Sequence, residues 1–364
     1  MKCIRLPSAP PCRTRKKPAA PGFFLCFAAC IALFCCVAVV GLSAKYHTAA
    51  PSLPVSVTVP LLGESTGSPP QTYAKAACLI DGKSGAVLYE KSSNLHLPMA
   101  STTKIMTALV VLEQLPLDAV VTVPKEATLV EGSSIYLREN EKITVKELLY
   151  GLLLESGNDA AHTLAVAAAG DIPSFAALMN QKAAALGLCD THFENPHGLS
   201  ADGHYTTAYE LARITAEAMK NEFFRTAVAT KKHISPSLDG ELTRYFFNHN
   251  KLLRLYESAV GVKTGFTKAA GRCLVSAAEK DGSLFIAVTL DDGNDWNDHM
   301  AMLSYASAQF DTVEIAAEHA FGVYAHQTHF SNPDGIFLTV PKGNAPVISY
   351  RASISETLGT VEYF

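Results

Sequence analysis

The chain has 364 residues, of which 48% are hydrophobic and 18% are charged, and its formal net charge is −4. This composition excludes a largely disordered chain, and the length predicts one large domain with a smaller domain or extended flanks.

The N-terminal segment has the layout of an export signal. Six basic residues and no acidic ones precede an apolar run from Phe23 to Leu42. The run is long for a cleaved signal peptide and about long enough to span a bilayer, while Gly41 to Ala44 would suit a signal peptidase. We predict that residues 1–44 are a signal peptide or a signal anchor, with cleavage favoured, and that the rest is exported.

Without the leader, the chain has 24 basic and 34 acidic residues, which argues against binding to nucleic acid. Six of the nine cysteines also lie in the leader. The other three, Cys78, Cys189 and Cys273, are widely spaced and predict neither a disulfide framework nor a metal cluster. We expect them to be small buried hydrophobic residues.

Residues 45–72 are rich in Pro, Ser and Thr and are predicted to form a flexible tether. The folded part begins near Tyr73. Ala76 to Ile80 and Ala86 to Glu90 flank a Gly-containing turn and predict a β-hairpin. Ile105 to Leu115 is apolar all round, which predicts a helix buried on most of its circumference.

Helical spacing recurs in four more segments, and the period then changes to that of strands followed by a final helix. The predicted helices are 145–154, 159–169, 172–186 and 209–219, the strands are 259–265, 271–278 and 284–290, and the last helix is 299–310. This order predicts an α+β fold with an antiparallel sheet flanked by helices, in which strands from opposite ends of the sequence meet. Short apolar runs at 335–340, 346–350 and 360–364 predict a β-rich segment over 311–364, either a reduced domain or an incomplete one.

Three short motifs carry the predicted chemistry. Ser101 and Lys104 lie one helical turn apart, so the lysine can accept the serine's proton if its pKa is lowered by burial and a second cation. Lys263 is the candidate for that cation. Each motif also has a structural explanation: Ser101 as a helix N-cap, Ser156 to Asn158 as a loop, and Lys263 to Gly265 as an edge strand with a solvated lysine.

The ordered set of motifs resembles the serine-type D-alanyl-D-alanine carboxypeptidases, which are low-molecular-mass penicillin-binding proteins. The resemblance covers about 73–310. It is carried by Pro98 to Ala108, Leu153 to Ala161 and Val262 to Thr267, with secondary likeness at 195–199, 204–208 and 296–299. It implies the α/β/α sandwich of the β-lactamase and transpeptidase-like superfamily.

The resemblance implies a two-step acyl transfer on the stem peptides of peptidoglycan. Ser101 would attack the carbonyl between two terminal D-alanines, and Lys104 would take its proton. Ser156 would help to protonate the departing amine, and Asn158 would hold the peptide and Lys104.

Lys263 and Thr264 would bind the terminal carboxylate, and Gly265 would leave room for the substrate backbone. The backbone N–H groups of Ser101 and Phe266 would form the oxyanion hole. Many relatives have histidine at the position of Phe266, so this departure should affect substrate preference. β-Lactams would acylate Ser101, and no cofactor or metal is implied.

Three alternatives remain: a D,D-endopeptidase, a class A-like β-lactamase and a non-catalytic penicillin-binding receptor. The β-lactamase alternative is weakened because Gly157 stands where that class has Asp and no counterpart of its extra glutamate is evident. The expected location is extracytoplasmic, secreted or tethered at the outer face of the bacterial cytoplasmic membrane. A membrane contact would depend on an uncleaved leader.

Two other features are interpreted without catalysis. The acidic cluster of Asp291, Asp292, Asp295 and Asp298 lacks calcium-loop spacing and predicts a solvated turn. His197 could be either a structural histidine or a neighbour of the active site.

Overall fold

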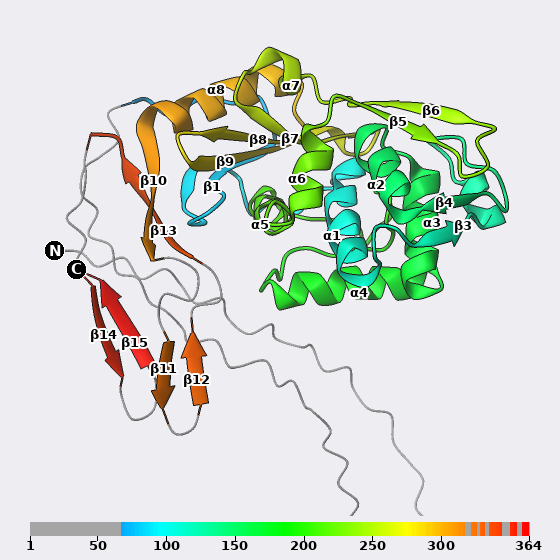
Figure 1. Ribbon diagram of the computed structural model, residues 1–364. Coiled ribbons are helices and arrows are strands. Elements are labelled where there is room, and N and C mark those ends of the chain that lie inside the picture. The colour runs from blue at the N-terminus through cyan, green and yellow to red at the C-terminus, as the bar shows by residue number, and fades with distance from the viewer. Residues whose placement is uncertain are drawn as a thin grey trace, which may run out of the picture.

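A computed structural model describes residues 67–316, 322–325, 328–331, 335–343, 350–354 and 359–363 (Figure 1). The predicted leader lies outside these residues, as does most of the predicted tether. Within the described part, no single helix could cross a membrane by length and composition, and only two consecutive helices, 158–169 and 172–185, bent by 83°, would pass together.

The centre of the fold is a five-stranded antiparallel sheet with the order β2-β1-β9-β8-β7. Its strands are β1 (Ala76–Asp81), β2 (Val87–Lys91), β7 (Ala259–Thr267), β8 (Gly271–Lys280) and β9 (Ser283–Leu290). The predicted hairpin is confirmed as β1–β2. The pairing of β1 with β9 joins opposite ends of the sequence, as predicted.

Alternation along the strands explains why both faces of this sheet are covered. Ala77 and Leu79 of β1 pack in a core cluster with Met302 of α8 (Asp295–Gln309), whereas Cys78 and Ile80 point into the larger core on the other face. Helix α8 therefore lies on one face and α5 (Ala208–Ala218) on the other (Figure 1). The result is the predicted layered α+β architecture.

The helical part surrounds α1 (Lys104–Gln114), whose residues from Lys104 to Val111 are all buried. The predicted helices are confirmed, and each begins within one residue of its predicted start except the last, which begins four residues earlier. Around α1 are α2 (Val145–Leu154), α3 (Asn158–Ala169) and α4 (Ile172–Ala185). Side-chain caps fix several starts, as where Thr144 accepts from the backbone N–H of Glu147.

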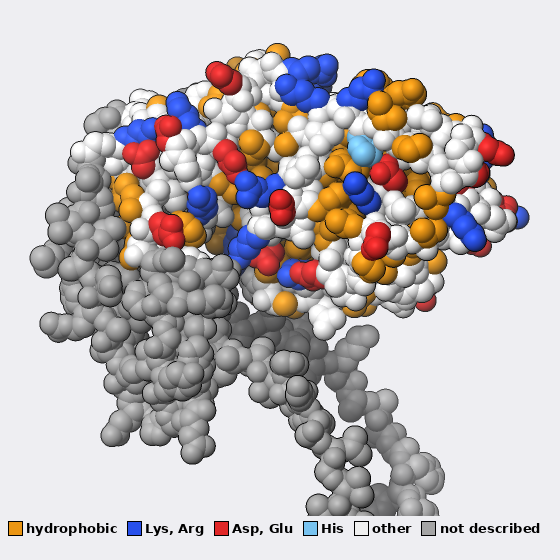
Figure 2. All heavy atoms as spheres, in the orientation of Figure 1, with side chains coloured by type: hydrophobic (Ala, Val, Ile, Leu, Met, Phe, Trp, Pro, Cys, Tyr) orange, Lys and Arg blue, Asp and Glu red, His pale blue; other side chains and the backbone are white. Residues whose placement is uncertain are grey.

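Several short elements were not predicted. They are α6 (Glu222–Ala229), α7 (Leu252–Leu255), the β3 (Val120–Thr122) and β4 (Lys142–Thr144) pair, and the β5 (Lys232–Pro236) and β6 (Thr243–Phe247) hairpin. The β5–β6 hairpin exposes Ile234, Tyr245 and Phe247, and the Lys232 Nζ lies over both aromatic rings. Figure 2 shows hydrophobic side chains beside basic ones over this part of the molecule.

The C-terminal strands form pairs of their own. They are β10 (Phe310–Ala316) with β13 (Ile336–Pro341), β11 (Gly322–Ala325) with β12 (Thr328–Ser331), and β14 (Tyr350–Ile354) with β15 (Gly359–Tyr363). The predicted strands at 335–340 and 360–364 are confirmed, and the one at 346–350 lies outside the described residues except for Tyr350. The buried carboxylate of Asp81 accepts from the Thr312 and Thr339 hydroxyls and so fastens β10 and β13 to the hairpin turn.

Candidate active site

Ser101 lies in a tight 3-10 turn, Ala100–Thr103, that leads directly into α1. Ser101 and Lys104 are one turn apart, as predicted, but that turn is of the tighter 3-10 type and precedes the α-helix. Ala100 before it has φ +48°, in the left-handed region that an L-residue with a side chain rarely adopts. The hydroxyls of Thr102 and Thr103 donate to the Met99 and Ala100 carbonyls and close the turn.

Lys104 is fully buried, and its Nζ contacts three oxygen atoms. They are Ser101 Oγ at 2.9 Å, Asn158 Oδ1 at 2.7 Å and the His197 carbonyl at 2.7 Å. Burial lowers the pKa of Lys104 well below its ordinary value, and the charge of Lys263 lowers it further against the opposing charge of Asp159. The amine is therefore driven toward its neutral form.

A neutral lysine has two N–H donors and one lone pair. A carbonyl oxygen can only accept, so the Asn158 and His197 oxygens take the two N–H groups. The remaining contact, Ser101 Oγ, is the one partner of the three that can donate. The lone pair of Lys104 is thus directed at the Ser101 hydroxyl, which is the arrangement required of a general base.

The second motif is organised by Asn158 and its neighbour Asp159. The Asn158 Nδ2 donates to the Glu131 carbonyl at 2.6 Å, so its Oδ1 must face Lys104. Asp159 accepts from Ser134 Oγ and from the backbone N–H groups of Ile135 and Leu137, and so holds the loop beside the site. The motif resemblance included Asp159, but its loop-holding contacts were not predicted.

Ser156 is buried, with φ +63°, and its Oγ has no hydrogen-bond partner among the described residues. A buried hydroxyl without a partner is unfavourable in a resting protein, typically by about 1–3 kcal/mol. Such a group is available to a ligand that enters the site.

The third motif lies on β7, the edge strand of the sheet. Lys263 is almost completely buried, which lowers its pKa to about 7 against the opposing charge of Glu155. A solvated lysine, the structural explanation of this motif, is therefore wrong. Its Nζ donates to the Thr264 carbonyl at 3.1 Å.

Gly265 lies against the Ala100–Thr103 turn. A Cβ there would be 3.0 Å from the Ser101 backbone nitrogen and 3.1 Å from that of Thr102. The glycine therefore lets β7 approach the turn, a reason different from the one the sequence suggested. Thr264 is half-buried, and the Phe266 side chain is 66% exposed.

The site residues are thus assembled to different degrees. Direct hydrogen bonds join Ser101, Lys104 and Asn158. Gly265 packs closely against the backbone of Ser101, and the charge of Lys263 lowers the pKa of Lys104. Ser156, Thr264 and Phe266 are placed here only as chain neighbours of these residues.

The segment from Asn195 to Leu199 packs against the Ala100–Thr103 turn and α1. The Thr107 hydroxyl donates to the Pro196 carbonyl at 2.6 Å, next to the carbonyl of His197 that accepts from Lys104. Burial lowers the pKa of the His197 ring to about 3, so the ring is neutral. His197 is therefore a neighbour of the site, and its contact with Lys104 uses the main chain.

Two other expectations need correction, one of them at a single residue. Three members of the acidic cluster are buried: Asp295 is paired with Arg272, Asp298 accepts from the Tyr73 backbone N–H, and burial raises the pKa of Asp292 to about 6.

Cys78 and Cys273 are buried and free as expected, but Cys189 is exposed and disulfide-bonded. Among the described residues, no group of three His, Cys, Asp or Glu side chains could hold a metal ion.

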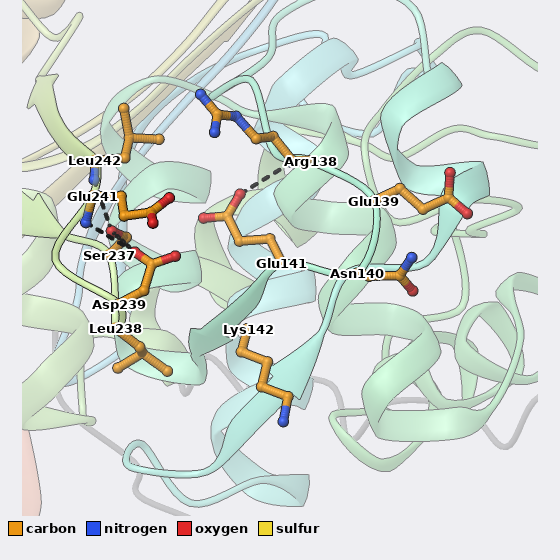
Figure 3. A pocket seen from close by; sticks show the side chains of 10 residues that line it. All are labelled: Arg138, Glu139, Asn140, Glu141, Lys142, Ser237, Leu238, Asp239, Glu241 and Leu242. Carbon is orange, nitrogen blue, oxygen red and sulfur yellow. Dashed lines mark hydrogen bonds between the residues drawn. The ribbon is translucent and has the colours of Figure 1, made fainter.

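A separate hollow of about 490 Å³ lies between the loop before β4 and the turn of the β5–β6 hairpin (Figure 3). None of the eight candidate site residues lines it. Glu141 on its wall is already neutralised by a bidentate pair with the buried Arg244, at 2.6 and 2.8 Å. The hollow is therefore not the site of the predicted chemistry.

Comparison with known proteins agrees with this geometry. Residues 64–294 match the family model described as D-alanyl-D-alanine carboxypeptidase. The chain belongs to this family. It is 37% identical over 248 residues to the D-alanyl-D-alanine carboxypeptidase DacF of Bacillus subtilis, a match covering 66% of this chain and 63% of that protein. It is also 39% identical over 237 residues to the D-alanyl-D-alanine carboxypeptidase of a Streptomyces strain, covering 61% and 81%.

Solved structures of the family show the same fold. The DD-transpeptidase of Streptomyces K15 matches with a TM-score of 0.62 and 36% identity, over 66% of this chain and 98% of that one. A penicillin-binding protein homologue from Mycobacterium tuberculosis matches with a TM-score of 0.62 and 33% identity, over 67% and 95%. The resemblance to low-molecular-mass penicillin-binding proteins and the fold class are therefore confirmed.

Proposed function

We propose that this protein is a serine-type D-Ala-D-Ala carboxypeptidase that removes the terminal D-alanine from peptidoglycan stem pentapeptides. The observation that carries the proposal is the buried Lys104 Nζ, which lies 2.9 Å from Ser101 Oγ and 2.7 Å from each of two carbonyl oxygens, an arrangement that leaves the lone pair of the neutral amine for the Ser101 hydroxyl. Family membership supports the same activity.

In the acylation step, Ser101 Oγ attacks the carbonyl carbon between the two D-alanines while its proton passes to Lys104. The oxyanion that forms accepts from the backbone N–H groups of Ser101 and Phe266, each typically worth about 3 kcal/mol. The C–N bond then breaks, and the proton held by Lys104 passes through Ser156 to the departing amine; the Ser156 hydroxyl has no hydrogen-bond partner among the described residues. Water then attacks the ester and releases the shortened peptide.

Substrate binding is assigned to the third motif. A protonated Lys263 and the Thr264 hydroxyl hold the terminal carboxylate, and Asn158 holds the peptide as well as Lys104. With a pKa of about 7, Lys263 is charged below neutrality and gains further charge stabilisation from a bound carboxylate.

β-Lactams present a carbonyl to the same serine, so they are expected to act as covalent inhibitors. A β-lactamase activity is disfavoured by the second motif, because a Cβ on Gly157 would already be 2.8 Å from Asp159 Oδ1. We place the activity outside the cytoplasm, where peptidoglycan is assembled. An uncleaved leader would retain the protein at the membrane.

The test uses the full chain with a peptide ending in D-Ala-D-Ala and a chromogenic cephalosporin. Release of free D-alanine with slow clearance of the cephalosporin adduct is expected, and Ser101→Ala should abolish both reactions. Ser174→Ala, an exposed serine at the start of α4, is the matched control and should behave as the native chain. Labelling by penicillin without D-alanine release would favour the receptor, and fast cephalosporin turnover would favour a β-lactamase.

One alternative outcome is favoured by a structural neighbour, which is named a DD-transpeptidase. The acyl-enzyme would then pass to an amine instead of water. Adding an amino acid acceptor to the same assay separates the two fates, because transfer yields a new peptide and hydrolysis yields the shortened one. Cleavage of cross-linked stem peptides would identify endopeptidase action.

A further inference from the structure

Thr103 lies between Ser101 and Lys104 in the sequence. Its hydroxyl takes part in a series of buried hydrogen bonds. His204 Nε2 lies 2.8 Å from Thr103 Oγ1, which lies 2.8 Å from the Ala100 carbonyl oxygen. At the other side of the ring, the Glu194 backbone N–H donates to His204 Nδ1 at 3.1 Å. His204 is 3% exposed, and Thr103 is fully buried.

The chemistry of the groups fixes which one donates in each of these hydrogen bonds. A backbone N–H can only donate, so His204 Nδ1 must accept from Glu194 and the ring proton must lie on Nε2. That proton is donated to Thr103 Oγ1. The threonine hydroxyl in turn donates to the Ala100 carbonyl, which can only accept.

The carbonyl at the end of this series controls the next amide. The Ala100 carbonyl and the Ser101 N–H belong to one planar trans peptide, so holding one group fixes the direction of the other. This peptide follows a left-handed residue, Ala100 with φ +48°, which the local sequence does not favour. It therefore needs supporting contacts.

A second contact restrains the same carbonyl. Gly198, with φ +88°, approaches so closely that a Cβ there would lie 1.9 Å from the Ala100 oxygen. The carbonyl is thus confined between a glycine and the Thr103 hydroxyl.

We propose that His204 is a positioning residue for the acylation step, because it orients the Ser101 N–H through Thr103 and the Ala100 carbonyl. The inference rests on the proposed function, in which that N–H stabilises the oxyanion. His204 does not touch the substrate. Its loss should therefore slow the chemical step while leaving substrate binding nearly unchanged.

Two substitutions separate the ends of the imidazole ring. His204→Gln retains an N–H donor near the place of Nε2 and loses the acceptor, whereas His204→Asn retains an acceptor near the place of Nδ1 and loses the donor. Rapid-mixing measurements with a β-lactam give the limiting acylation rate and the affinity of the preceding complex separately. The peptide substrate gives kcat and KM.

His204→Asn is expected to lower the acylation rate and kcat about 10- to 100-fold, as misplaced reacting groups do, with affinity and KM within about threefold. His204→Gln should keep the acylation rate, kcat, the affinity and KM within about threefold of the native values. Equal rates for the two variants, or a loss confined to KM, would overturn the inference. The same pair of substitutions at the exposed His96 is the control and should have no effect.

If either His204 variant fails to fold, Thr103→Ser and Thr103→Val decide instead. The serine keeps the hydroxyl donor to Ala100 and should react at the native rate, whereas the valine should show the slowed acylation. Equal rates for this pair would overturn the inference. A native chain that is never acylated at Ser101 would instead refute the proposed function, so the two failures are distinguishable.

Discussion

Gly198 offers a sharp test of the close packing against the turn that holds Ser101. Gly198→Ala places a methyl group 1.9 Å from the Ala100 oxygen, 2.4 Å from its carbonyl carbon and 2.9 Å from Thr103 Oγ1. Two of these atoms belong to the main chain, so relief requires a backbone shift on the order of 1 Å or more to restore ordinary contact. Gly170→Ala is the matched control, because Gly170 has φ +86° and nothing within 4 Å of its Cβ position.

Both substitutions bear the left-handed backbone penalty of about 1–2 kcal/mol. For a domain of this size each kcal/mol lowers Tm by about 2–4 °C, so Gly170→Ala should lower it by about 2–8 °C. Overpacking adds about 1–3 kcal/mol at Gly198, and a further drop of about 2–12 °C is expected. Because the shift displaces the peptide that contains the Ser101 N–H, acylation should also slow about 100-fold.

The assay combines thermal unfolding with the limiting rate of β-lactam acylation in the native chain and both variants. Gly170→Ala is expected to keep the native acylation rate despite its lower Tm. The packing argument is refuted if the two variants lose equal stability, or if Gly198→Ala is acylated as fast as Gly170→Ala.

Two further predictions concern the charge of Lys263. Its pKa of about 7 means that the free enzyme loses this cation as the pH rises, so kcat/KM for a peptide carboxylate should fall above about pH 7. A substrate whose terminal carboxylate is replaced by an amide should lack that decline, and an identical decline for both would contradict the assignment. Lys263→Met should abolish carboxylate selectivity yet raise the free energy of unfolding, since it removes a buried charge. The buried charge of Lys263 lowers the free energy of unfolding by its full amount below pH 7. This effect decreases between pH 7 and 10.5, because Lys263 loses its proton in the folded state at a lower pH than in the unfolded state. Urea unfolding at pH 6 should therefore show a larger gain than at pH 9.5, and an equal gain would count against it.

The sheet and the long helices could be predicted because the spacing of apolar residues in these segments matches the period of a strand or a helix. Helix α1 is apolar on every side, and the strands of the sheet are apolar runs between turn residues. The β5–β6 hairpin was missed although it carries a recognisable signal. An Asp239-Gly240 turn separates its two strands, and Gly240 has φ +75°.

The features that could not be predicted depend on distant parts of the chain. The burial of Asp295 requires Arg272, which lies on a neighbouring strand and forms a bidentate pair with it. The positive φ of Ala100 has no local cause either. The Ala100 carbonyl is confined by Gly198, almost a hundred residues away, and that contact forms only when the two segments pack together.

The same distinction applies to Lys104, the proposed general base. The motif specifies a serine and a lysine one turn apart. That spacing alone does not determine whether the lysine amine is neutral and able to accept the proton of the serine hydroxyl. Here the direction of the Lys104 lone pair follows from two neutral oxygens, one on Asn158 and one on the main chain of His197. A carboxylate in place of the Asn158 amide would accept from Nζ equally well, yet its charge would raise the pKa of Lys104 and keep the amine protonated. An amide whose orientation is fixed by the Glu131 carbonyl therefore holds the amine in place without removing its ability to act as a base.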